Sequence, residues 1–407
     1  MTTTKKSGFA SMLASASLGA VMFSSYVGPG FASGTQTVQY FLTKGWIGVF
    51  LGLIVCGALA LIVNLMTFEF NRVYRPLNYR EQADLIYRGK APRLIIGTFV
   101  DIHGFLTPIV SVAAQISACS LLLNNLWGLP IPVGTVLYCV IVIALALFGA
   151  HVVRVTGSFL TCAILAVTVY IGITGIPNAW EGCMQFIAEG STPEDYGFST
   201  IDAWYIMIVF MSNFLCGGNA CVNASRGVLV TRKDVIFSAV TNIFLCVAAT
   251  MVYTVVFAAG MPEIANESLP TLWAIQNLCG GARGAQIIYA VLATAAMLST
   301  GIALTFGVAN RWDKTLEKVW KNSTSFMRQA SVAILIILIC TVGSTFGILN
   351  IVKYGFTYLA KISWPVLCCL PCFTIPWRIA KDKKEGLIGP DGYYIHADSL
   401  EKIAEEG

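Results

Sequence analysis

Apolar stretches alternate with short polar segments along the whole chain. A transmembrane helix needs about 20 mostly apolar residues, and ten stretches reach that length. They lie at roughly 9–42, 46–70, 94–123, 131–150, 155–176, 201–224, 235–260, 284–309, 328–350 and 355–377. The pattern therefore predicts an all-α integral membrane protein with about ten transmembrane helices.

Two of these stretches contain helix breakers near the middle of the predicted membrane. The first span is cut at Gly28-Pro29-Gly30, and the sixth at Cys216-Gly217-Gly218-Asn219. Unpaired backbone groups inside a bilayer persist only where they line a cavity or a site. The alternatives are a proline kink packed against neighbouring helices and a glycine contact between helices.

The two breaks occupy matching places in two sets of five spans. We place the first repeat at about 9–176 and the second at about 201–377. Because each repeat has an odd number of spans, the repeats enter the membrane in opposite orientations. The sequence predicts an inverted five-plus-five repeat with discontinuous helices 1 and 6.

Composition and charge support a membrane protein and give its orientation. Of the 407 residues, 56% are hydrophobic and 12% are charged, against about 25% charged in soluble domains. With the N-terminus inside, the predicted outer loops hold only three cations, and the inner loops and tail hold the rest; the three are Lys44, Arg283 and Lys353. This positive-inside pattern predicts a multi-pass protein of the cell membrane with both termini in the cytoplasm. The net charge of +5 then reports topology and gives no reason to expect nucleic-acid binding.

Several smaller features complete the predicted organisation. Residues 1–377 form the transmembrane domain and 378–407 a polar cytoplasmic tail, in which Tyr393-Tyr394-Ile395 is able to dock. We expect an outer loop at 177–200 and a separate inner amphipathic helix at 311–326. The sequence leaves open whether Cys183 and Cys279, both in predicted outer loops, form a disulfide. No metal site is expected, because no histidine or carboxylate accompanies the cysteines near residue 370.

The first break offers groups for both ends of a zwitterion. The inner half-helix ends near Tyr26 and leaves carbonyls that favour a cation, whereas a half-helix that starts near Phe31 leaves amides that favour an anion. Glycines let a ligand approach the backbone closely. The candidate binding residues here are Tyr26, Gly28, Gly30, Phe31, Ala32, Ser33 and Gly34, with free amides expected at the last three.

The sixth span adds a second wall to this candidate site. Carbonyls released after Ser212, together with the side chain of Asn213, are able to hold an ammonium group. Phe210 and Phe214 are candidate apolar walls or gates.

A coupling ion has two competing candidate sites. Ser299 and Thr300, adjacent hydroxyls in the eighth span, can join carbonyls near Tyr26 and Val27 in a sodium site, or can simply bond carbonyls of their own helix. Ionisable groups within spans are costly and are functional candidates. Asp101, His103 and Lys361 are therefore candidates for proton-linked or gating roles, with Asp101 either a proton carrier or a structural partner of an inner base.

Residues around the first break resemble a known family. Val27-Gly28-Pro29-Gly30-Phe31-Ala32-Ser33-Gly34, followed by Thr35-Gln36, is similar to the G-A-G-F-A-S-G-Q signature of the YkvI-type putative amino acid permeases. These belong to the amino acid–polyamine–organocation superfamily. The match extends to Ser212-Asn213 and Ser299-Thr300, whereas Pro29 and Cys216-Gly217-Gly218 depart from it. The resemblance implies the LeuT-like fold and transport by alternating access.

The sequence thus predicts a secondary transporter for an amino acid or a related zwitterionic or cationic amine. We expect sodium coupling and no other cofactor, with the lipid bilayer and a small solute as the only partners. The alternatives are a proton-coupled carrier or a channel-like protein for another small organic solute, and a non-transporting membrane sensor. No zinc-protease helix, nucleotide-binding loop or serine–histidine set is present, so an enzyme is not expected. Substrate, direction and oligomeric state stay open.

Overall fold

Helices form nearly all of the regular structure. The computed structural model describes residues 8–76, 79–147, 150–214, 222 and 225–395, and within them the only strand-like feature is an isolated bridge between Ile388 and Tyr394. The helices are α1 (Gly8–Tyr26), α2 (Pro29–Ser33), α3 (Thr35–Tyr40), α4 (Leu51–Tyr74), α5 (Tyr79–Ile86), α6 (Lys90–Trp127), α7 (Ile131–Leu147), α8 (Ala150–Ala188), α9 (Thr200–Phe214), α11 (Arg232–Ala258), α12 (Pro270–Asn277), α13 (Arg283–Val319), α14 (Ser325–Ser344), α15 (Ile348–Asn350), α16 (Thr357–Trp364) and α17 (Leu370–Lys384). Two π-helical turns, Ile351–Phe356 and Pro365–Cys369, join α15 to α17 into one long rod.

A helix lies at each of the ten predicted spans, which confirms the all-α membrane fold. Among the described residues, six helical stretches are by themselves long and apolar enough to cross a membrane: α4, α6, α11, most of α13, α14 and the rod from Ile348 to Lys384. Shorter apolar helices cover Ser11–Phe23, Ile131–Leu147 and Thr200–Phe210. The remaining predicted span, 155–176, lies inside α8.

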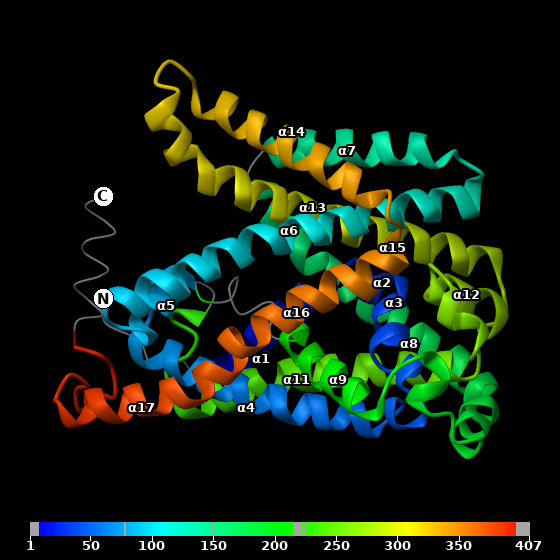
Figure 1. Cartoon of the computed structure of the whole chain (residues 1–407), viewed down its shortest axis with the longest axis horizontal. Coiled ribbons are helices and arrows are strands. Elements are labelled where there is room, and N and C mark those ends of the chain that lie inside the picture. The colour runs from blue at the N-terminus through cyan, green and yellow to red at the C-terminus, as the bar shows by residue number, and fades with distance from the viewer. Residues whose placement is uncertain (1–7, 77–78, 148–149, 215–221, 223–224, 396–407) are drawn as a thin grey trace.

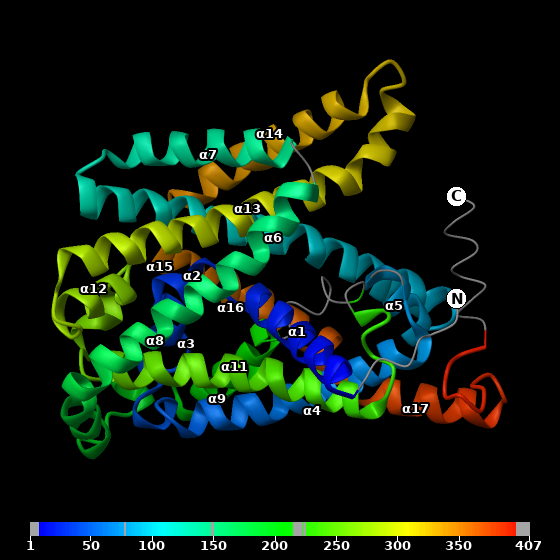
Figure 2. The ribbon, with the colours of Figure 1, turned by 180° about the vertical axis from the view of Figure 1, so that it is seen from behind.

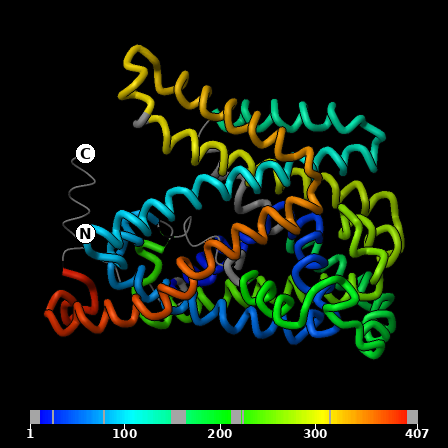
Figure 3. The backbone as a smooth tube through the Cα atoms, in the orientation of Figure 1, coloured from blue at the N-terminus to red at the C-terminus, as the bar shows by residue number. Residues whose placement is uncertain are grey.

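Eight of the ten spans form two groups, which lie in the upper and lower parts of Figure 1. Helices α6, α7, α13 and α14 pack on one another in one group, and α1, α4, α9 and α11 form the other. Each group therefore takes two neighbouring spans from each predicted repeat. The view from behind shows α8 running obliquely between the groups (Figure 2), where it packs on both α11 and α13. The rod from α15 to α17 lies on the face of the molecule opposite α8 (Figure 3). Its α16 part packs on α9, and its α17 part packs on α4.

The polar connections differ from the sequence prediction in three places. The outer loop expected from 177 begins only after Ala188, because α8 continues through Pro177. The helix expected at 311–326 is the last part of α13, which ends at Val319. The rod likewise runs to Lys384, beyond the expected end at 377. In all three places the apolar run ends before the helix does, because a helix outside the bilayer needs no apolar side chains.

The extension of α8 decides the state of the two outer cysteines. Cys183 lies within α8 and is buried, and Cys279 follows α12 and is also buried. Both are free thiols. The disulfide that the sequence left open is therefore not formed.

The residues after α17 dock on the end of the molecule that the charge pattern places inside. The Tyr394 amide donates a 2.9 Å hydrogen bond to the Val73 carbonyl, and the Tyr394 ring lies 5.0 Å from that of Tyr74. The Tyr393 ring lies under the Arg75 guanidinium at 3.9 Å. The docking that the sequence allowed for Tyr393-Tyr394-Ile395 therefore takes place on the end of α4.

Candidate functional site

The first span is broken where the glycine–proline sequence predicts it. Helix α1 ends at Tyr26 and α2 begins at Pro29, with Gly28 between them in an extended conformation (φ −99°, ψ −167°). Pro29 occupies the first helical position, where its missing N–H costs no hydrogen bond. A second change of direction follows at Gly34, whose φ of +86° lies in the left-handed region that glycine adopts readily.

The free amides of the second half-helix lie earlier than predicted. The Ala32 amide donates to the Gly28 carbonyl at 3.0 Å, and the Gly34 amide donates to the Phe31 carbonyl at 2.9 Å. The prediction placed free amides at Ala32, Ser33 and Gly34, but helix α2 starts two residues sooner because Pro29 opens it. Among the described residues no acceptor lies within hydrogen-bonding distance of the Gly30 and Phe31 amides.

The three glycines of the break have different surroundings. Among the described residues, a methyl group added to Gly28 would meet nothing closer than the Tyr26 carbonyl oxygen at 4.0 Å, so these residues leave space beside Gly28. The same group on Gly30 would lie 2.4 Å from Cγ of Gln36, and on Gly34 2.7 Å from the ring of Phe257. Only Gly28 therefore leaves room for a ligand, whereas Gly30 and Gly34 are required by packing.

Gln36 is a polar group of the break that the sequence reasoning missed. Its side chain packs against Gly30, and it is 5% exposed. Its Oε1 atom has no hydrogen-bond partner among the described residues. A buried polar atom without a partner costs free energy, so this carbonyl oxygen is available to a donor that enters the break.

Aromatic rings close the predicted outer side of the break. Tyr26 and Phe31 have ring centroids 5.1 Å apart, and Phe210 from α9 lies 6.3 Å from Tyr26. Phe210 also contacts Tyr40 at 4.4 Å. The structure thus brings together Tyr26, Phe31 and Phe210 as the sequence suggested, and adds Tyr40 and, against Phe31 at 4.9 Å, Tyr253.

The break is anchored to two other spans by hydroxyl groups. The Tyr26 hydroxyl lies 2.8 Å from Oγ1 of Thr250 on α11. The Tyr289 hydroxyl, from α13, donates to the Ala32 carbonyl at 2.8 Å. The Ser33 hydroxyl lies 2.8 Å from that of Thr35 and is used within the break itself. These bonds hold α1 and α2 on different neighbours.

The second predicted break lies outside the described residues. Helix α9 reaches Phe214, so Ser212, Asn213 and Phe214 belong to its last turn by their backbone. The predictions for these three side chains and for Cys216 to Asn219 concern parts of the chain that the structure does not describe.

The eighth span approaches the break at Tyr289, ten residues before Ser299. At 1.5 Å per residue, Ser299 lies about 15 Å further along α13 toward the predicted inner end. The Thr300 hydroxyl donates to the Ala296 carbonyl of its own helix at 3.1 Å, which is the plainer of the two readings of the sequence. Ser299 is buried. The sodium site with Tyr26 and Val27 stays a prediction.

Asp101 is part of an ion-pair group. Its carboxylate lies 2.6 Å from Arg80 on α5 and 3.5 Å from Arg311 on α13. It therefore links α5, α6 and α13, as expected of a structural partner of an inner base. His103 lies one helical turn before Thr107, and the Thr107 hydroxyl donates to the His103 carbonyl at 2.8 Å. The His103 ring stacks on the ring of Phe99, with ring centroids 6.3 Å apart.

Lys361 lines a cavity that the sequence did not predict. The cavity measures about 120 Å³ and lies at the predicted outer end. Two more lysines line it, Lys44 and Lys353, together with Gln39, Phe198 and Ile206. The only sequence signal was that Lys44 and Lys353 are among the few cations of the predicted outer loops.

Comparison with known proteins identifies the fold. No family model matches the sequence, and no curated protein matches it. Solved structures do match. The inward-facing conformation of Mhp1 matches with a TM-score of 0.60 and 19% identity, and the match covers 88% of this chain and 75% of Mhp1. An Eremococcus coleocola manganese transporter matches with a TM-score of 0.57 and 16% identity, and the match covers 95% of this chain and 90% of that one. MhsT in complex with L-phenylalanine follows at a TM-score of 0.52 and 16% identity, over 92% and 88% of the two chains.

These structures share the LeuT-like fold, and this chain has that fold. The resemblance to YkvI-type permeases is not tested by a sequence match and stays a prediction. A fold shared at this level of identity does not fix the cargo. Among the described residues no three histidine, cysteine or acidic side chains converge on a point that can hold a metal ion.

Proposed function

We propose that this protein is a secondary transporter that moves an amino acid or a related zwitterionic amine across the cell membrane by alternating access. The observation that carries the proposal is the break at Gly28. Among the described residues, this break combines space beside Gly28, amides of Gly30 and Phe31 without a backbone partner, and a buried oxygen of Gln36 without a partner. Unpaired polar groups are costly inside a bilayer and persist only where they line a cavity or a site, and a continuous helix would leave none.

The chemistry of the break suits a solute with both charges. The amides of Gly30 and Phe31 open a helix and point their partial positive charge at the space beside Gly28, which favours a carboxylate. Oε1 of Gln36, which is buried and unpartnered, is an acceptor for an ammonium hydrogen. Tyr26, Phe31 and Phe210 supply apolar walls.

The similar structures support the transport class without giving the cargo. They include a manganese transporter, MhsT in complex with L-phenylalanine, and a sodium-coupled sialic acid symporter. The symporter matches with a TM-score of 0.51 and 17% identity over 93% of this chain and 88% of that one. A fold that carries such different solutes specifies the alternating motion, while side chains at the site specify the cargo.

Coupling to sodium is the second part of the proposal. Sodium is a hard cation that prefers several oxygen ligands, and the hydroxyls of Ser299 and Thr300 with the carbonyls of Tyr26 and Val27 would provide them. The competing proton-coupled mechanism uses Asp101. The ion pairs of Asp101 with Arg80 and Arg311 support a structural task for this carboxylate instead.

Solute counterflow in proteoliposomes tests the transport proposal. Purified protein is reconstituted, loaded with one unlabelled amino acid at a time, and assayed for uptake of the labelled form with and without sodium. A saturable counterflow signal supports a carrier. Flux without saturation indicates a channel. Specific binding without flux indicates a sensor.

A pair of glycine variants tests the location of the site. Gly28→Val fills the open space without a steric clash, so folding is retained and counterflow is lost. Gly307→Val is the matched control, because a side chain there also meets no neighbour within 4 Å. Gly30→Val is unsuitable, because it clashes with Gln36. Normal counterflow by Gly28→Val would place the site elsewhere.

The sodium proposal has its own test. The double change Ser299→Ala and Thr300→Ala removes both hydroxyls, and the sodium concentration for half-maximal uptake should rise about tenfold or more, equivalent to about 1.4 kcal/mol. Uptake that is indifferent to sodium in the unmodified protein contradicts sodium coupling and leaves the transport proposal intact.

A further inference from the structure

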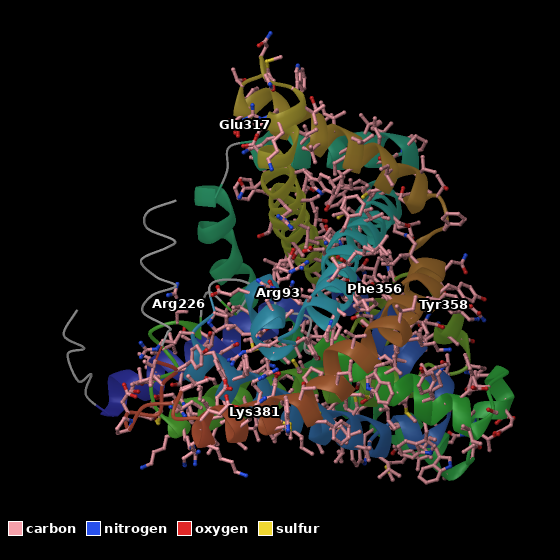
Figure 4. The ribbon with its side chains drawn as sticks, turned by 60° about the vertical axis from the view of Figure 1, so that its left-hand side comes forward. Arg93, Arg226, Glu317, Phe356, Tyr358 and Lys381 are labelled. Carbon is pink, nitrogen blue, oxygen red and sulfur yellow. The ribbon has the colours of Figure 1, made fainter. Side chains whose placement is uncertain are left out.

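Three lysines from distant parts of the chain converge on the cavity at the predicted outer end. Lys44 follows the first span, and Lys353 and Lys361 lie on the rod that forms the tenth span. Lys44 is at the floor and is only 1% exposed, whereas Lys353 is exposed and Lys361 half-buried. In Figure 4, Tyr358, which lines the same cavity, lies at the right of the view, whereas Arg93 lies near the centre and Arg226 at the left.

None of the three lysines has an anionic partner. Among the described residues no carboxylate forms an ion pair with Lys44, Lys353 or Lys361. Aromatic rings take that place: Nζ of Lys44 lies 3.2 Å from the ring centre of Phe198, and Nζ of Lys361 lies 5.6 Å from that of Tyr205. Ring faces attract cations but do not neutralise them.

The carboxylates nearest in sequence to Phe198, which lines the cavity, are engaged elsewhere. Glu194 accepts hydrogen bonds from the amide and hydroxyl of Thr200. Asp195 and Asp202 accept from Thr192 and Ser199 at helix starts. These acids cap the segment before α9, so the described residues supply no carboxylate counter-charge to the lysines of the cavity.

Burial of an unpaired cation is costly unless an anion accompanies it. The cost at this site is visible in Lys44. Burial, with the charges of Lys353 and Lys361, lowers the pKa of Lys44 from its ordinary 10.5 to about 7. The other ionisable groups that line the cavity are the phenols of Tyr354 and Tyr358.

We propose that the cavity between Lys44, Lys353 and Lys361 is a binding site for a small anion or anionic group, distinct from the break at Gly28. Its ligand presents a compact oxyanion, either a carboxylate or a phosphodiester. Either a soluble acid or the headgroup of an anionic lipid supplies this chemistry, because Tyr354 and Tyr358 at the mouth are exposed on the outer face of the rod. Gln39, which is 8% exposed, adds an amide to the floor of the site.

Succinate is the first probe, and succinamide is its uncharged control. Full-length protein in nanodiscs of phosphatidylcholine alone is titrated at constant ionic strength, and the thermal unfolding midpoint is recorded. Succinate should raise the midpoint, and succinamide should not. The half-saturating succinate concentration should rise about tenfold or more in Lys361→Met and in Lys44→Met. Lys381→Met, at the opposite end of the rod, should bind as the unmodified protein does.

A proton measurement identifies Lys44 as part of the site. Calorimetric titration at pH 8 in two buffers of different ionisation heat counts the protons taken up with each anion. Because Lys44 is largely neutral at that pH and charged when an anion binds, uptake should approach about one proton. It should vanish in Lys44→Met.

Nanodiscs that contain phosphatidylglycerol separate the two sources of the anionic group. A higher midpoint in these discs that is lost in Lys361→Met, without any succinate effect, supports the site with a lipid headgroup as its ligand. The proposal is overturned if neither succinate nor phosphatidylglycerol changes the midpoint. It is also overturned if both lysine variants respond like Lys381→Met. None of these outcomes depends on transport.

Discussion

The cations at the two ends of the molecule have different partners. At the predicted inner end, carboxylates pair with arginines from other segments: Asp382 of α17 lies 2.7 Å from Arg88 in the connection between α5 and α6, and Glu69 of α4 lies 3.3 Å from Arg232 of α11. At the predicted outer end, the lysines of the cavity face aromatic rings and one another. Several arginines of the inner end are thus neutralised within the chain, whereas the three lysines of the outer cavity have no carboxylate partner among the described residues.

The difference teaches how the same kind of residue serves two purposes. An arginine with a bidentate carboxylate partner joins two helices, and its charge is no longer available to a solute. An unpaired lysine beside a cavity raises the local concentration of anions. A net-charge count or a positive-inside count sees both as cations and does not distinguish them.

The largest expected effect is the loss of an inner ion pair. Asp382 is fully buried and accepts hydrogen bonds from Tyr74 at 2.6 Å and from Arg88. Asp382→Ala leaves Arg88 unpaired, and the free energy of unfolding should fall by about 3 kcal/mol. Glu385→Ala, three residues later and exposed, is the control and should change it by less than about 0.5 kcal/mol. Equal stability of both variants would mean that the inner pairs do not hold this end together.

Removal of the outer lysine Lys44 should raise the free energy of unfolding, whereas loss of the inner pair lowers it. Protonation of Lys44 favours the unfolded chain, since its pKa is about 7 in the folded protein against 10.5 ordinarily. Lys44→Met should therefore stabilise the protein by about 2 kcal/mol at pH 6. The difference should shrink as the pH rises from about 7 toward 10. Thermal midpoints in phosphatidylcholine nanodiscs without added anions measure it. A gain that grows with pH contradicts the assignment.

A smaller effect is expected from the half-exposed inner pair. Asp101→Asn weakens the contacts with Arg80 and Arg311, and the unfolding free energy should fall by about 1 kcal/mol at most. If Asp101 is structural, sodium-dependent uptake persists in this variant with its pH profile unchanged. Loss of uptake that tracks the proton gradient would instead make Asp101 a proton carrier.

The smallest effect concerns the docked tail. Tyr393→Ala removes the ring under Arg75 and the hydroxyl that donates to the Val230 carbonyl at 3.0 Å. The loss should be about 0.5–1 kcal/mol, and limited proteolysis after residue 385 should become faster. Ile395→Ala, an exposed neighbour, should be cleaved at the original rate. Unchanged cleavage of Tyr393→Ala would show that Tyr394 alone holds the tail.

The spans and the first break could be read from the sequence because they depend on neighbouring residues. A bilayer requires about 20 apolar residues for each helix whatever the rest of the chain does, so ten helices lie at the ten apolar stretches. Gly28-Pro29 interrupts a helix by its own backbone chemistry. The helix ends at Ala188, Val319 and Lys384 escaped prediction, since apolar content marks the bilayer and not the helix.

The tertiary structure alone decided which of the candidate groups have partners. Gln36 fills the space beside Gly30, and Asp101 lies between two arginines, because packing brings these groups together. The lysine cavity joins Lys44 to Lys361 across more than 300 positions of sequence. Charge, hydroxyl and glycine content are properties of the chain, whereas pairing depends on distances of a few ångströms between segments that only folding brings together.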